Sequence, residues 1–104
     1  METEVVVMVV VQDFIDSLEF SVQKEVYKLI FLLRNHGHTL SMPEAKPVGR
    51  GLWELRVNAK PAIRILYGFC DRRAILVLGF KKQRSAIFTR DFNLALKRFK
   101  AYCN

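Results

Sequence analysis

Hydrophobic and polar residues recur with different periods along the chain, and the N-terminal part predicts one strand and two helices. Residues 5–11 form an unbroken apolar run rich in valine, which is typical of a strand buried on both faces. Asp13 is expected to cap a short helix that follows this strand. A longer helix is expected to begin at Ser21 and to end at Gly37, which fits the left-handed position after a helix. Its apolar residues recur at helical spacing, at Val22, Val26, Leu29, Ile30 and Leu33.

The second half of the chain predicts three neighbouring strands, at residues 52–58, 62–70 and 74–82. The polar segment 71–73 is too short for anything but a turn, so the last two strands are expected to form an antiparallel hairpin. The stretch 38–51 contains two prolines and two glycines and is expected to be a long loop.

The last predicted element is a helix with Thr89 as its N-cap and Asp91 in its first turn. Its apolar stripe consists of Phe92, Ala95, Leu96, Phe99 and Tyr102. The predicted order is therefore β-α-α-β-β-β-α. This is an α+β fold with a mostly antiparallel sheet, two N-terminal helices and a C-terminal helix. At 104 residues the chain is expected to be one domain, residues 1–104.

Strand alternation gathers charged residues on one face of the predicted sheet, at Glu54, Arg56, Arg64 and Lys81. Large apolar side chains face the other way, at Trp53, Ile65 and Phe80. Gly68 and Gly79 fall on the charged face, where they would let a ligand approach the backbone. Two interpretations stay open. The cations bind a phosphodiester backbone, or they are solvated strand charges with Glu54 paired to a neighbouring arginine.

The net charge of +7 is concentrated in one half of the chain. Residues 1–45 carry three basic and seven acidic side chains, whereas residues 46–104 carry fourteen basic and three acidic ones. A basic excess confined to one half indicates a polyanionic partner such as nucleic acid, with an acidic protein as the alternative.

Several classes of protein are not expected from this sequence. The longest apolar run is far shorter than the roughly 18 residues of a transmembrane helix, and acidic residues precede it where a signal peptide has basic ones. No glycine-rich nucleotide loop and no serine-hydrolase elbow occurs. His36 and His38 would need further ligands to hold zinc, so neither a metal nor another cofactor is predicted. Cys70 and Cys103 make no disulfide framework, and the expected compartment is a reducing cytoplasm.

Four segments together resemble a known family. Residues 51–56 read GLWELR, residues 64–67 read RILY, residues 79–82 read GFKK, and Ala95 and Arg98 follow on the last helix. At these spacings they resemble the HigB-like branch of the RelE/ParE toxin superfamily, which includes phage-derived Gp49-like proteins. The resemblance covers nearly the whole chain. One departure is the segment 83–89, which lacks the proline usual in the family and carries Phe88.

The resemblance implies the toxin of a type II toxin–antitoxin pair, a ribosome-dependent mRNA endonuclease that needs no metal. Such toxins act by attack of a ribose 2′-OH on the adjacent phosphate. The expected partners are mRNA, the ribosome and a cognate antitoxin, a small helix-turn-helix protein encoded adjacently. No membrane partner is implied.

The resemblance also assigns roles to matched residues. Arg56, Arg64 and Lys81 are expected to stabilise the phosphate and the transition state. Glu54 is expected to act as a base or, more simply, to orient the arginines. The residues expected to contact flanking RNA or ribosomal RNA are Lys46, Arg50, Lys82 and Arg84. Two alternatives remain: a non-catalytic gyrase inhibitor of the ParE kind, and an inactive prophage protein that binds only its antitoxin or DNA.

Overall fold

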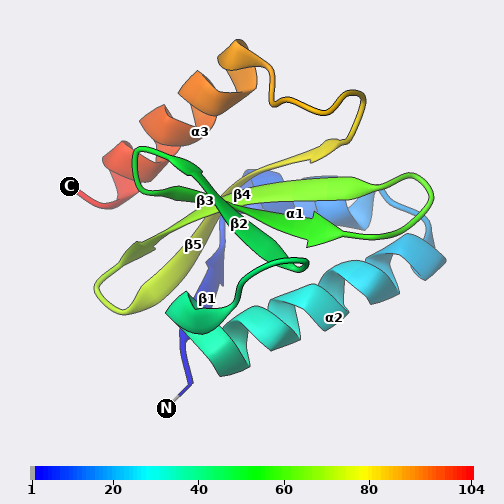
Figure 1. Cartoon of the computed structure of the whole chain (residues 1–104), viewed down its shortest axis with the longest axis horizontal. Helices are drawn as coiled ribbons and strands as arrows, with labels where there is room; N and C mark the ends of the chain where they lie inside the picture. The colour runs from blue at the N-terminus through cyan, green and yellow to red at the C-terminus, as the bar shows by residue number, and fades with distance from the viewer. Residues whose placement is uncertain (1) are drawn as a thin grey trace.

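A five-stranded sheet with helices on both faces forms the protein (Figure 1). The structure is a computed structural model that describes residues 2–104. In chain order the elements are β1 (Glu4–Val7), α1 (Val9–Asp16), α2 (Phe20–His36), the short 3₁₀ helix η1 (Gly37–Thr39), β2 (Ala45–Gly49), β3 (Leu52–Val57), β4 (Ile63–Cys70), β5 (Arg73–Lys81) and α3 (Thr89–Tyr102). The strands lie side by side in the order β1-β5-β4-β3-β2, and only the β1–β5 pair is parallel. The predicted α+β class and element order are confirmed, with β2 as an additional strand.

The helices divide into two layers, one on each face of the sheet. α1 and α2 pack on one face against residues such as Leu55, Ile65 and Tyr67. α3 packs on the other face, where Ala95 and Leu96 contact a second cluster around Leu66. Figure 1 shows α2 and α3 on opposite sides of the sheet. Within residues 2–104, no helix is both long enough and apolar enough to cross a membrane.

The apolar run 5–11 is not one strand, and this prediction is wrong. β1 pairs with β5 only as far as Val7, opposite Leu76, and α1 begins at Val9. The helix buries one side of the run and exposes the other, so Val11 is 1% exposed and Val9 is 77% exposed. Valine tolerates a helix here because burial of that one side outweighs its low helix propensity.

The helix starts also differ from prediction, whereas the end of α2 agrees with it. Met8, Glu19 and Phe88 occupy the N-cap positions, without side-chain capping hydrogen bonds, so the three predicted caps Asp13, Ser21 and Thr89 lie inside helices. Gly37 ends α2 with a φ of +53°, and a Cβ there would collide with Thr3. Asp91 lies in the first turn of α3, as predicted.

The segment 38–51 is not only a loop. It contains η1 and the edge strand β2, whose pairing with β3 shifts register between Pro47 and Gly49. A proline is tolerated there because an edge strand has one side without a hydrogen-bonded neighbour. The predicted hairpin of β4 and β5 is confirmed, with Asp71 and Arg72 at positive φ in its turn.

A β-bulge in β5 changes which face its later residues occupy. Leu66 of β4 pairs with Leu78, but the next residue, Tyr67, pairs with Leu76, so Val77 is the extra residue. Val77 and Leu78 both pack on the α3 side. The alternation is therefore reversed from Leu78 onward, and Phe80 lies on the α3 side, paired with Arg64.

Cys70 and Cys103 form a disulfide, whereas the sequence led us to expect no disulfide framework and a reducing compartment. It joins the end of β4 to the residue that follows α3. Thirty-three positions separate the two cysteines, so sequence spacing gave no sign of the pair.

Candidate functional site

A basic cavity of about 230 Å³ lies on the α3 side of the sheet, beside the segment that joins β5 to α3. Strands β2 to β5 supply its floor, and the joining segment supplies one wall. Its lining residues are Lys46, Glu54, Arg56, Arg64, Phe80, Lys82, Arg84, Ser85 and Ala86. Six of the eight residues predicted from the sequence are thus brought together in one cavity.

A carboxylate and two guanidiniums form the floor of this basic cavity. Arg56 Nη1 lies 3.4 Å from Glu54 Oε1, and Arg64 Nε lies 3.8 Å from the same oxygen. Arg64 Nη1 also donates a hydrogen bond to the carbonyl of Ile63 at 3.0 Å. Glu54 and Arg64 are only 5% and 7% exposed. These contacts hold the two guanidiniums in place before any ligand binds.

Burial makes the charge of Arg64 costly. Desolvation lowers the pKa of Arg64, the nearby positive charge of Arg56 lowers it further, and Glu54 opposes both effects. Arginine remains protonated under such a shift because its ordinary pKa is so high. The fold therefore keeps a buried cation that one shared carboxylate only partly compensates. An anion entering the cavity would complete this compensation.

Two lysines reach the basic cavity because of their strand register. Lys46 of β2 is the direct partner of Glu54 on β3, and direct partners in an antiparallel pair share a face. Lys82 follows the end of β5, where its N–H donates to the Ala62 carbonyl at 2.9 Å and extends the pairing by one residue. Because of the bulge, Lys82 shares the face of Phe80 and Arg64.

Lys81 and Arg50 lie outside the basic cavity. Lys81 pairs with Ile63 and lies on the face opposite Arg64, so the prediction that places it beside Arg56 and Arg64 is wrong. The physical reason is the bulge at Val77, which a strict two-residue period cannot foresee. Arg50 is exposed in the β2–β3 turn, with a φ of +54°.

Gly68 and Gly79 were predicted to let a ligand approach the charged face. The structure shows that they do not. A Cβ at Gly68 would clash with the ring of Phe99 from α3, and one at Gly79 would clash with the ring of Phe14 from α1. Each glycine instead allows an aromatic ring to pack closely on the strand. The site residues that sequence reasoning missed are Phe80, Ser85 and Ala86. Strand alternation placed Phe80 on the face opposite the charged residues, and no sequence motif marks Ser85 or Ala86.

The fold is that of the RelE toxins. A mutant of the E. coli toxin RelE in the free state, with two arginines changed to alanine, matches with a TM-score of 0.70 at 12% identity. The match covers 94% of this chain and 98% of that one. The family model "Phage derived protein Gp49-like" matches residues 13–100. The chain belongs to this Gp49-like family, and its fold is shared with the toxin RelE. No curated protein matches the sequence.

Proposed function

We propose that this protein is the toxin of a type II toxin–antitoxin pair and cleaves mRNA on the ribosome. One observation carries the proposal: two preorganised guanidiniums, Arg56 and Arg64, lie at the floor of a basic cavity in a chain of the RelE/ParE superfamily. A site of this charge and size suits one phosphodiester group with its flanking phosphates.

The reaction is an internal transfer at phosphorus. The ribose 2′-oxygen loses its proton and bonds to the adjacent phosphorus, and the bond from phosphorus to the 5′-oxygen breaks as that oxygen gains a proton. The products are a 2′,3′-cyclic phosphate and a 5′-hydroxyl. Negative charge builds on the non-bridging oxygens in the transition state, so fixed positive donors accelerate the step.

Each residue of the basic cavity then has a role in this reaction. Arg64 and Arg56 donate to the non-bridging oxygens. Glu54, already shared between two guanidiniums, orients them, and this double pairing favours an orienting role over that of a base. The residues that bind flanking phosphates are Lys46, Lys82 and Arg84. The protein is proposed to act in the cytoplasm, where its ribosomal target lies.

Expression of the protein without a partner is expected to arrest growth and to leave mRNAs cut within their coding regions. The measurement is growth after induction, combined with mapping of new 5′ ends in cellular RNA. The cut ends should carry a 5′-hydroxyl. Growth arrest with intact mRNA and blocked gyrase supercoiling would contradict the nuclease and support a ParE-like inhibitor. Normal growth with soluble protein would support an inactive prophage protein.

A cognate antitoxin is expected to bind this chain tightly through an acidic segment. Residues 46–104 carry a large basic excess, and a partner of opposite charge would both associate quickly and cover the cations. Co-expression with the small protein encoded next to this one should yield one complex at moderate salt, and growth should be restored. Separate elution of the two proteins would contradict this prediction.

A further inference from the structure

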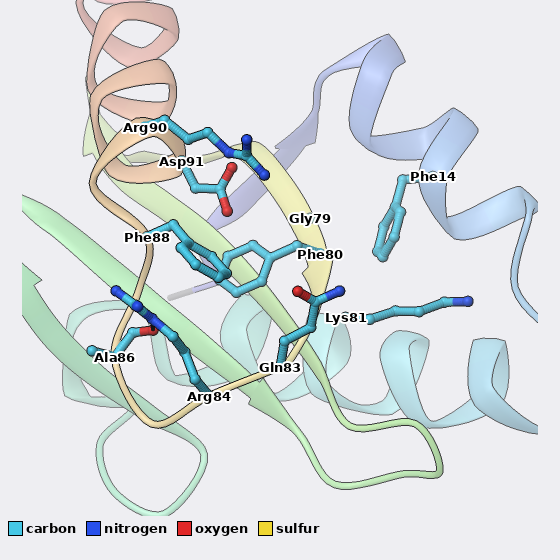
Figure 2. A pocket seen from close by; sticks show the side chains of 10 residues that line it. All are labelled: Phe14, Gly79, Phe80, Lys81, Gln83, Arg84, Ala86, Phe88, Arg90 and Asp91. Carbon is cyan, nitrogen blue, oxygen red and sulfur yellow. Dashed lines mark hydrogen bonds between the residues drawn. The ribbon is translucent and has the colours of Figure 1, made fainter.

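A second cavity, of about 350 Å³, lies beside the basic cavity, and the proposed chemistry does not use it. It lies between α1, the end of β5 and the segment that leads into α3 (Figure 2). Three half-buried phenylalanines line it, Phe14, Phe80 and Phe88, together with Lys81, Arg84 and Arg90. We call it the aromatic cavity. Its volume is within the roughly 300–1,000 Å³ range of small-molecule sites.

The aromatic cavity adjoins the basic cavity. Both are lined by Phe80, Arg84 and Ala86, so these residues form a shared wall. Phe80 reaches this wall because the bulge turns it to the α3 side. A nucleic acid strand that extends from Arg64 along this shared wall leads to the aromatic cavity.

Phe88 supports a flat cationic surface in the shared wall. The guanidinium carbon of Arg84 lies 4.1 Å from the centre of the Phe88 ring, and that of Arg90 lies 5.7 Å from it. Arg84 Nε also donates to the carbonyl of Ala86 at 3.2 Å. Arg84 is thus fixed by a ring and by a backbone carbonyl although its segment is exposed. Rings and guanidinium planes of this kind stack nucleobases.

Lys81 and Asp91 complete the chemistry of the aromatic cavity. Figure 2 shows Lys81 extending from β5 toward Phe14 and away from Arg84, and Asp91 directed toward the rings of Phe80 and Phe88. Lys81 supplies a positive charge for a second phosphate. The Asp91 carboxylate supplies an acceptor for the amino group of a base.

We infer that the aromatic cavity holds the nucleobase of a nucleotide next to the phosphate bound at Arg56 and Arg64. This inference rests on the proposed function and extends it, because it adds base recognition to phosphate recognition. Phe88 and Arg84 stack the base, Asp91 accepts a hydrogen bond from it, and Lys81 binds the phosphate beyond it. In this arrangement Lys81 and Arg64 contact the same RNA from opposite faces of the sheet.

The test uses RNA that cannot be cleaved, so that binding is measured without the reaction. The probes are end-labelled trinucleotides in which 2′-O-methylation removes the attacking hydroxyl, with each position in turn made abasic. Fluorescence anisotropy of the full chain should show that one abasic position weakens binding about 5- to 150-fold, the usual effect of losing one stacked base. Phe88→Leu should remove the difference between that abasic probe and the base-bearing probe, and Phe88→Tyr should preserve it.

A matched control is Phe31→Leu. Phe31 is 56% exposed on α2 and lines neither cavity, so this substitution should leave all affinities unchanged. Thermal melting checks each variant. If Phe88→Leu does not fold, Phe14→Leu serves in its place, because Phe14 lines the same cavity from α1. Equal binding of all probes, or no binding of any, overturns the inference. Equal binding together with mRNA cleavage in cells would overturn only the base site. Base-selective binding without mRNA cleavage would overturn only the nuclease.

Discussion

Arg64→Met is expected to reduce mRNA cleavage by about 10²–10³-fold, the usual cost of losing one preorganised donor to the transition state. The variant should still fold, because Arg56 stays 3.4 Å from Glu54 and keeps a partner for that buried carboxylate, so the melting temperature should fall only moderately. Burial lowers the pKa of Arg64, which means that the folded state disfavours its charge. Methionine keeps an unbranched apolar stem in the buried position and removes that charge. The measurements are the cleavage rate of ribosome-bound mRNA and thermal melting of the purified variant.

The matched control for this prediction is Lys100→Ala. Lys100 is exposed in the last turn of α3 and lines neither cavity, so cleavage and melting should stay as in the parent protein. A folded Arg64→Met protein with full activity would show that the basic cavity is not the catalytic site. A large fall in melting temperature would show that Arg64 serves mainly as the ion-pair partner of Glu54.

The cleavage rate and the melting temperature of Arg64→Met together would show whether Arg64 serves catalysis or the stability of the fold. Removing one partner of a buried ion pair lowers the stability of a protein, whereas removing a donor to the transition state slows the reaction without unfolding the protein. A large loss of activity in a variant that remains folded is the signature of a catalytic cation.

Strand alternation predicted part of this site correctly. Trp53, Leu55 and Ile65 face the α1–α2 layer, and Glu54, Arg56 and Arg64 share the opposite face, because β3 and β4 pair without interruption. The prediction fails in β5, where one extra residue, Val77, reverses the order of faces. A bulge of this kind leaves no signal in an apolar run, because every residue from 74 to 78 is hydrophobic. The consequence is that Lys82 lines the basic cavity and Lys81 does not.

Long-range pairing explains the other differences from prediction. The run 5–11 has the composition of a buried strand, yet β1 finds only four partners on β5, and the residues after it turn into α1. β2 contains Pro47 and Gly49, which mark loops, and it is a strand only because β3 lies beside it. In both segments tertiary contacts override local preference. The helices α2 and α3 were predictable because their apolar stripes are local properties of the sequence.

Reduction of the disulfide between Cys70 and Cys103 is expected to lower the free energy of unfolding by roughly 3–4 kcal/mol, from the chain entropy of the loop that it closes. The loop spans 33 positions. For a domain of this size the melting temperature should fall by at least about 10 °C. The measurement is thermal and denaturant unfolding with and without reductant. A variant in which both cysteines are alanine should match the reduced protein and should not respond to reductant.

The reduced protein should nevertheless stay folded and toxic, because other contacts keep α3 on the sheet. Ala95 and Leu96 are buried against the β4–β5 cluster, and Arg98 Nη1 donates to the Val77 carbonyl at 2.9 Å, next to the bulge. The disulfide joins Cys103 to Cys70 at the end of β4, and neither cysteine lines the basic cavity. Identical unfolding midpoints in both redox states would contradict the stabilising role of the disulfide. Loss of toxicity in the alanine variant, with folding intact, would show instead that the position of the α3 C-terminus controls the site.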